Sequence, residues 1–84
     1  MPNQRKIAIK IRSKDRTGLI FEITKIFSDM NVGILNHSAR VYNDRNRGMI
    51  SECNLIVCPE NEDITALAKR RLRKIKGVIS VNES

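Results

Sequence analysis

Apolar and basic residues alternate in the first regular segment of the chain. Ile7, Ile9 and Ile11 share one face of this segment, and Lys10 and Arg12 lie on the other. A period of two predicts a half-buried strand over about 5–12. Further along, apolar residues recur at helical spacing and predict a helix over about 17–30. These residues are Leu19, Ile20, Ile23, Ile26, Phe27 and Met30.

The rest of the chain continues the alternation of strand and helix signals. Three further strands are expected, at about 34–42, 49–58 and 78–81. The polar segment 43–48 is typical of a hairpin loop. Asn61 or Asp63 can cap a second helix, and Gly77 can end it. The order β-α-β-β-α-β predicts an α+β fold, in which a four-stranded antiparallel sheet carries both helices on one face.

The length of 84 residues predicts one small domain, 1–84, of which about 5–82 would be ordered. The core of such a domain is small, so oligomerisation would stabilise it. No apolar run approaches the roughly 20 residues of a membrane span, and no signal peptide is recognised. Cys53 and Cys58 are five residues apart and point to opposite faces of one expected strand. We therefore expect reduced cysteines and a cytoplasmic protein that does not contact a membrane.

The net charge of +7 arises mainly from two basic segments, 5–16 and 69–76. This excess of positive charge favours an anionic partner such as nucleic acid, although solvated strand and helix faces would carry the same pattern. The candidate phosphate-binding residues are Lys10, Arg12, Lys69, Arg70, Arg73, Lys74 and Lys76.

Catalytic and metal-binding motifs find little support in the sequence. The single histidine, His37, falls in the middle of an expected strand, where a packed or surface role is more common than a catalytic one. The cysteines lack the C-x-x-C spacing of metal loops, and Gly18 stands alone rather than in a phosphate-binding loop. The expected strands also lack the aromatic residues that stack bases in sheet-based RNA recognition. No catalytic residue, metal or cofactor is therefore expected.

The loop between the first strand and the first helix is a candidate ligand site. Asp15 could accept hydrogen bonds from an ammonium group, and the first N–H groups of the helix could hold a carboxylate. Together these groups would bind the two ends of a free amino acid. Alternatively, Asp15 only caps the helix, and Gly18 only permits close packing of helix and strand.

The motifs of the chain resemble those of the ACT domain family over almost the whole length. The family opens with a strand, a D/N-R-P-G-L motif and an amphipathic helix, which are matched here by Asp15-Arg16-Thr17-Gly18-Leu19 and its flanks. It closes with a Leu- and Lys-rich helix followed by G-V-x-x-V, as at 77–81. The D-R-x-G-L-I-x-x-I-T, C-N-L-I and L-R-K-I-x-G-V-x-S-V patterns are most similar to the C-terminal ACT domain of RelA/SpoT-type (p)ppGpp synthetase/hydrolases.

This resemblance implies a ferredoxin-like fold, a homodimer and a ligand at the dimer interface. The implied ligand-binding residues are Asp15, Arg16, Gly18, Leu19 and Ile20, with Gly33 and Ile34 opposite them. Thr17 replaces the usual proline, which is a mild change at a helix start. Gly33 stands where serine-sensing members carry a ligand-binding asparagine, which disfavours a polar ligand and favours a branched-chain amino acid.

The resemblance also implies a function and a larger parent protein. The 84 residues would be a C-terminal fragment with Met1 as an added start. The domain would not be an enzyme itself, and it would couple amino-acid or ribosome status to distant catalytic domains. Ribosomal RNA is the anionic partner that the resemblance implies. The alternatives are a free-standing amino-acid-binding regulator of a separate metabolic enzyme, an RNA-binding module without a small ligand and, more distantly, a small enzyme.

Overall fold

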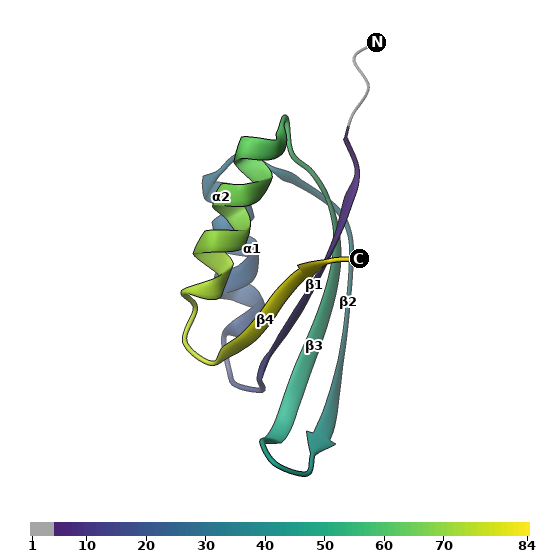
Figure 1. Ribbon diagram of the computed structural model, residues 1–84, viewed down its shortest axis with the longest axis vertical. Coiled ribbons are helices and arrows are strands. Elements are labelled where there is room, and N and C mark those ends of the chain that lie inside the picture. Colours follow the sequence, from purple (N-terminus) through teal and green to yellow (C-terminus); the bar gives the residue numbers. More distant parts are fainter. Residues whose placement is uncertain (1–4) are drawn as a thin grey trace.

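The computed structural model describes residues 5–84, which form four strands and two helices (Figure 1). The expectation that Met1 is an added start concerns a residue outside this described range. The elements are β1 (Ile7–Lys14), α1 (Leu19–Asp29), β2 (Gly33–Asp44), β3 (Gly48–Cys58), α2 (Glu62–Arg73) and β4 (Val78–Glu83). The predicted element order is confirmed.

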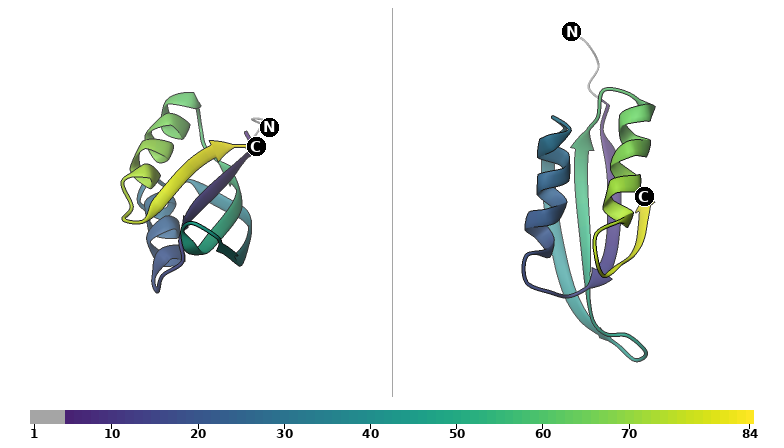
Figure 2. Two further views of the ribbon diagram at one scale, coloured as in Figure 1. Left: turned by 60° about the horizontal axis from the view of Figure 1, so that its bottom comes forward. Right: turned by 90° about the vertical axis from the view of Figure 1, so that its left-hand side faces the viewer.

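The strands form one antiparallel sheet in the order β2-β3-β1-β4, and both helices cover the same face of it (Figures 1 and 2). The predicted ferredoxin-like α+β sandwich is therefore confirmed. We call the face that the helices leave uncovered the open face of the sheet.

The core lies between the helices and the inner face of the sheet. The period-two isoleucines of β1 are buried there as predicted, with Ile9 and Ile11 almost fully covered. Phe27 from α1 and Leu72 from α2 are fully buried against them. Cys53 is part of this core, and burial raises the pKa of its thiol. Cys53 and Cys58 are both free and do not form a disulfide with each other.

The first helix begins later than predicted, and its cap differs. It starts at Leu19 rather than at 17, and its N-cap is Gly18 in the left-handed region at φ 85°, without a side-chain cap. The prediction that Asp15 caps this helix is therefore wrong. The backbone N–H of Asp15 instead donates to the carbonyl of Met49 at 3.0 Å, which holds Asp15 beside β3.

The second helix is capped by one of the two predicted candidates. The side chain of Asn61 accepts a hydrogen bond from the backbone N–H of Ile64 at 2.9 Å. Glu62 and Asp63 occupy the first turn, while Arg70, Arg71 and Arg73 occupy the last. Both sets of charges suit the helix dipole, so part of the basic character of α2 has a purely structural explanation.

Strand β2 contains one irregularity that decides which side chains share a face. Ile34 pairs with Val57, but Asn36 pairs with Ile56, so Leu35 is an extra residue in the ladder. Such a bulge reverses the alternation of side chains that follow it. Beyond the bulge, Val41 consequently lies on the helix side of β2.

Candidate ligand-binding site

The loop that precedes α1 forms the first half of the candidate site. Gly18 is exposed, and its left-handed backbone turns the chain from β1 into α1. The N–H groups of Ile20 and Phe21 lie in the first helical turn, where no acceptor within the helix is within reach. Leu19 is buried in the core, so its backbone, rather than its side chain, is what faces the loop.

Arg16 ties this loop to the connection between α2 and β4. Its guanidinium donates to the carbonyl of Lys76 at 3.1 Å and forms an ion pair with Glu22. Gly77 lies beside it at φ 93°, and the Gly77 carbonyl accepts a bond from the Lys14 N–H at 3.0 Å. A hollow of about 590 Å³ lies between these segments. Its lining residues are Lys14, Asp15, Arg16, Glu22, Lys76 and Gly77.

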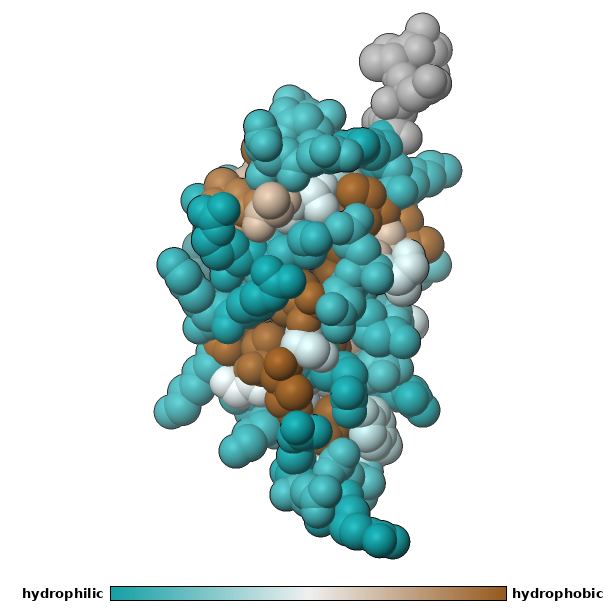
Figure 3. Space-filling view, in the orientation of Figure 1, coloured by the Kyte–Doolittle hydropathy of each residue, from teal (hydrophilic) through white to brown (hydrophobic). Residues whose placement is uncertain are grey.

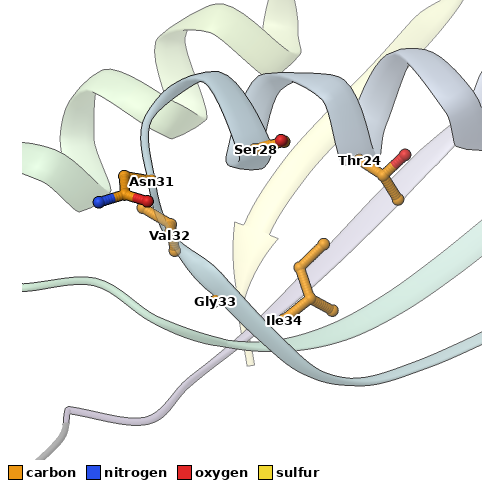
Figure 4. Close-up of a pocket in the computed structure, with 6 residues that line it drawn as sticks. All are labelled: Thr24, Ser28, Asn31, Val32, Gly33 and Ile34. Carbon is orange, nitrogen blue, oxygen red and sulfur yellow. The ribbon is translucent and has the colours of Figure 1, made fainter.

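The second half of the candidate site lies where α1 ends and β2 begins. Asn31 adopts the left-handed conformation at φ 58° and directs the chain into β2. A hollow of about 380 Å³ follows, with Gly33 and Ile34 on one side and α1 on the other (Figure 4). Thr24 and Ser28, one helical turn apart, contribute its hydroxyl groups. The sequence analysis missed these two residues, although their spacing of four places them on one flank of the helix.

A single chain does not bring the two halves together. Asp15, Arg16 and Gly18 precede α1, whereas Gly33 and Ile34 follow it. The helix has 11 residues, so Gly18 and Gly33 lie near ends that are about 16 Å apart along its axis. An amino acid is too small to contact both of them in one chain.

Four exposed apolar residues lie on α1 and on β2, the edge strand of the sheet. They are Ile20, Phe21, Leu35 and Val41, and we call this set the α1–β2 edge. The exposed fractions of its three most exposed members are 71% for Phe21, 54% for Leu35 and 48% for Val41. Because β2 is the outermost strand on this side, its outer N–H and C=O groups are unpaired as well.

The fold matches that of solved structures. The ACT domain from GTP pyrophosphokinase of Chlorobium tepidum superposes with a TM-score of 0.78 at 26% sequence identity, over 98% of this chain and 100% of that chain. The solution structure of the same domain gives a TM-score of 0.72 at 26% identity, over 96% of this chain and 86% of that chain. The chain is an ACT domain. The resemblance that the sequence motifs indicated is thereby confirmed.

A solved structure of lower sequence identity contains the same fold as part of a much longer chain. A homoserine dehydrogenase from Thiobacillus denitrificans gives a TM-score of 0.75 at 16% identity, over 96% of this chain but only 17% of that chain. No protein-family model and no curated protein matches the sequence.

The basic residues of the ACT domain lie on both sides of the sheet rather than on one surface. Lys10 and Arg12 alternate with buried isoleucines and therefore face the open side. Two cations of α2 are engaged within the domain: Lys69 pairs with Glu83 at 2.7 Å, and Arg73 donates to the Val81 carbonyl at 3.2 Å. Of the remaining candidate residues, Arg70, Lys74 and Lys76 are exposed on the helix side. One flat partner could not contact both sets at once.

The open face of the ACT domain carries a polar cluster that the sequence analysis missed. Arg12 donates to the Tyr42 hydroxyl at 3.1 Å, and Arg40 lies 5.0 Å from the centre of the Tyr42 ring. Arg40 also donates to Glu52 at 3.0 Å, and this hydrogen bond lowers the pKa of Glu52. Because the pKa of Glu52 is lowered in the folded state, its ionised carboxylate stabilises the fold above the ordinary pKa of 4.5. This stabilisation is lost as the pH falls through the lowered pKa.

Three further observations bear on the chemistry of the ACT domain. Within residues 5–84, no three His, Cys, Asp or Glu side chains are grouped so that they could hold a metal ion. Neither of the helices in that range is long and apolar enough to cross a membrane. His37 is exposed on β2.

Proposed function

We propose that the chain is the regulatory ACT domain of a cytoplasmic, stringent-response (p)ppGpp synthetase/hydrolase. It would couple amino-acid or ribosome status to catalytic domains elsewhere in the protein. The observation that carries this proposal is the similarity to the ACT domain of a GTP pyrophosphokinase, which extends over the full length of that domain. The alternative is a free-standing regulator of a separate enzyme, which would have the same fold.

The proposed assembly is a two-fold homodimer through the α1–β2 edge. Phe21, Leu35 and Val41 are exposed apolar residues of α1 and of β2, whose outer edge is unpaired. A second copy of the same edge would cover the apolar side chains and continue the backbone hydrogen bonding across β2. The contact would be self-complementary, because both copies present the same exposed apolar residues next to the same strand edge.

A two-fold arrangement also explains why the ligand residues are divided between the ends of α1. An axis that crosses the middle of α1 places the start of one helix beside the end of the other. Asp15 and Gly18 of one protomer would then face Gly33 and Ile34 of its partner. The ammonium group of the ligand would meet Asp15, its carboxylate the N–H groups of the first helical turn, and its side chain Ile34.

The ligand that we propose for this interface is a branched-chain amino acid. Gly33 offers no side-chain amide for a polar ligand, and Ile34 is a half-buried apolar wall. Such a ligand would bind the dimer but not the separated chains. Regulation would follow from this difference in affinity, because a ligand can shift an equilibrium only toward the state that it binds better.

Thermal melts against the twenty amino acids test the sensor part of the proposal. A branched-chain amino acid at 100 times its Kd should stabilise the dimer by about 2.7 kcal/mol. Replacement of Asp15 by alanine should abolish this gain, because the ligand's ammonium group loses its acceptor. Asp63→Ala, which removes a carboxylate from the first turn of α2, is the matched control and should keep it. No shift with any amino acid, while the dimer stays intact, would reject amino-acid sensing.

The stringent-response part is tested in cells of the source organism. In-frame deletion of this domain from its native gene should alter (p)ppGpp accumulation during amino-acid starvation, measured by nucleotide chromatography. Asp15→Ala in the same gene should reproduce part of the change if sensing by the loop is involved. Unaltered (p)ppGpp in the deletion strain would contradict the assignment and favour a regulator of another enzyme.

A further inference from the structure

The hairpin between β2 and β3 projects beyond the rest of the sheet. Strand β1 ends at Lys14, which pairs with Ile50, whereas β2 and β3 continue their pairing as far as Asp44 and Gly48. Figure 1 and the right-hand view of Figure 2 show this end of the hairpin extending past the helices. The hairpin tip, residues 44–48, is therefore reachable from several sides.

Hydrogen bonds between the Asp44 side chain and the backbone hold the turn at the tip in one shape. The carboxylate of Asp44 accepts hydrogen bonds from the N–H groups of Asn46 and Arg47, at 2.8 and 3.0 Å. Gly48 leaves the turn at φ 80°, a conformation that glycine adopts at little cost. The hydrogen bond from Asn46 also lowers the pKa of Asp44, so the carboxylate stays ionised and in place. The tip thus presents its side chains from a fixed backbone.

Two arginines, Arg45 and Arg47, project from this turn. Both are exposed, and none of the ion pairs formed within residues 5–84 includes either guanidinium. Lys14 and Arg12 continue the positive charge along the adjoining end of β1. Of the nearby carboxylates, that of Asp44 is engaged with the turn and that of Glu52 with Arg40, while Asp15 lies beside Met49. The space-filling view shows a hydrophilic surface over this end of the molecule (Figure 3).

We propose that the hairpin tip binds the phosphate backbone of a nucleic acid through Arg45 and Arg47, with Lys14 as an auxiliary contact. Guanidinium groups recognise phosphates through paired N–H donors. Protein–protein hot spots, in contrast, depend on buried aromatic or aliphatic anchors, and the turn itself offers none. The only tyrosine, Tyr42, is engaged by Arg12 and Arg40, so base stacking is not the mode of binding.

This inference deepens the ribosome branch of the proposed function and assigns it a surface that differs from the basic residues of α2. The choice of nucleic acid as the partner depends on the proposed link to the ribosome. It does not depend on amino-acid sensing. The measurement below detects nucleic-acid binding alone, so its failure leaves the tests with amino acids and (p)ppGpp unaffected.

Fluorescence anisotropy with a labelled RNA duplex of about 20 base pairs tests the proposal. The double variant Arg45→Gln/Arg47→Gln should bind about ten-fold or more weakly at low salt. Its plot of log affinity against log salt should be shallower by about 1.4–1.8, because two phosphate contacts are lost. Arg45→Lys/Arg47→Lys keeps the charges and should retain most of the slope. A DNA duplex of the same sequence distinguishes RNA from DNA as the source of the phosphates.

A matched pair of arginines on α2 distinguishes a local contact at the hairpin tip from an effect of net charge. Arg70→Gln/Arg71→Gln removes the same number of charges from α2 and should change the affinity by less than about two-fold. An equal loss in the two double variants would overturn the proposal, because only net charge would then matter. Loss confined to the α2 variant would overturn it as well, in favour of a site on that helix. Circular dichroism melts confirm that both variants are folded.

Discussion

Replacement of Phe27 by alanine is expected to lower the free energy of unfolding by about 3–5 kcal/mol. Phe27 is fully buried between α1 and the sheet, and its truncation removes contacts with both layers at once. A domain of this size has a total stability of only about 3–5 kcal/mol from its core. Most molecules of the variant should therefore be unfolded at 37 °C. Urea titration followed by circular dichroism measures the loss.

The chain provides a matched control on the same helix. Phe21 is 71% exposed, so Phe21→Ala should change the free energy of unfolding by less than about 0.5 kcal/mol in the monomer. This comparison requires protein concentrations below the dimerisation range. Similar losses for the two variants would contradict the burial that separates them. If Phe27→Ala does not fold at all, Phe27→Leu should retain the fold with a smaller loss.

Introduction of a charge at Phe21 is expected to separate the proposed dimer. A two-fold dimer contains every substitution twice, so Phe21→Asp would place two carboxylates in the apolar contact. A cost of about 1.4 kcal/mol for each would weaken the association about a hundred-fold. Analytical ultracentrifugation over a range of concentrations measures the change. The ligand-induced rise in melting temperature should be lost in the same variant, because the ligand residues of two chains no longer meet.

A second aspartate on the other side of the sheet is the control for this experiment. Ile56 is an exposed apolar residue of the open face, and Ile56→Asp should leave the association unchanged. Equal weakening by both substitutions would mean that the open face is also an interface. An undiminished dimer in Phe21→Asp would exclude the α1–β2 edge, whatever the effect of Ile56→Asp.

The periodic pattern of the sequence predicted the fold because each core residue follows a simple rule. The isoleucines of β1 obey the period of two and lie in the core, and the apolar residues of α1 obey the helical period. Asn61 marks the start of α2 as its cap, whereas the prediction that Gly77 ends the helix is wrong, because α2 ends at Arg73 with Lys74 as its C-cap, three residues before the left-handed Gly77. These signals act over a few residues, so they can be recognised without knowledge of the tertiary structure.

Other features were hidden because they depend on residues far apart in the sequence. Asp15 has the right identity and position for a cap, but its hydrogen bond to Met49 from the distant β3 decides its place. Arg16 was predicted as a ligand residue, and its contact with Lys76 across 60 positions appears only in the fold. The cluster of Arg12, Tyr42 and Glu52 requires the strand register, which periodicity alone does not give.

The extra residue at Leu35 has a consequence for comparisons between ACT domains. Without it, the even-numbered side chains of β2 would continue on the side of Ile34; with it, Arg40 and Tyr42 lie against Arg12 and Glu52 instead. An alignment with an ACT domain whose edge strand lacks this extra residue must place its gap at Leu35, because a gap elsewhere in the strand would equate inward with outward positions. Substitution patterns along β2 are thus interpretable only when the single-residue offset is assigned to Leu35.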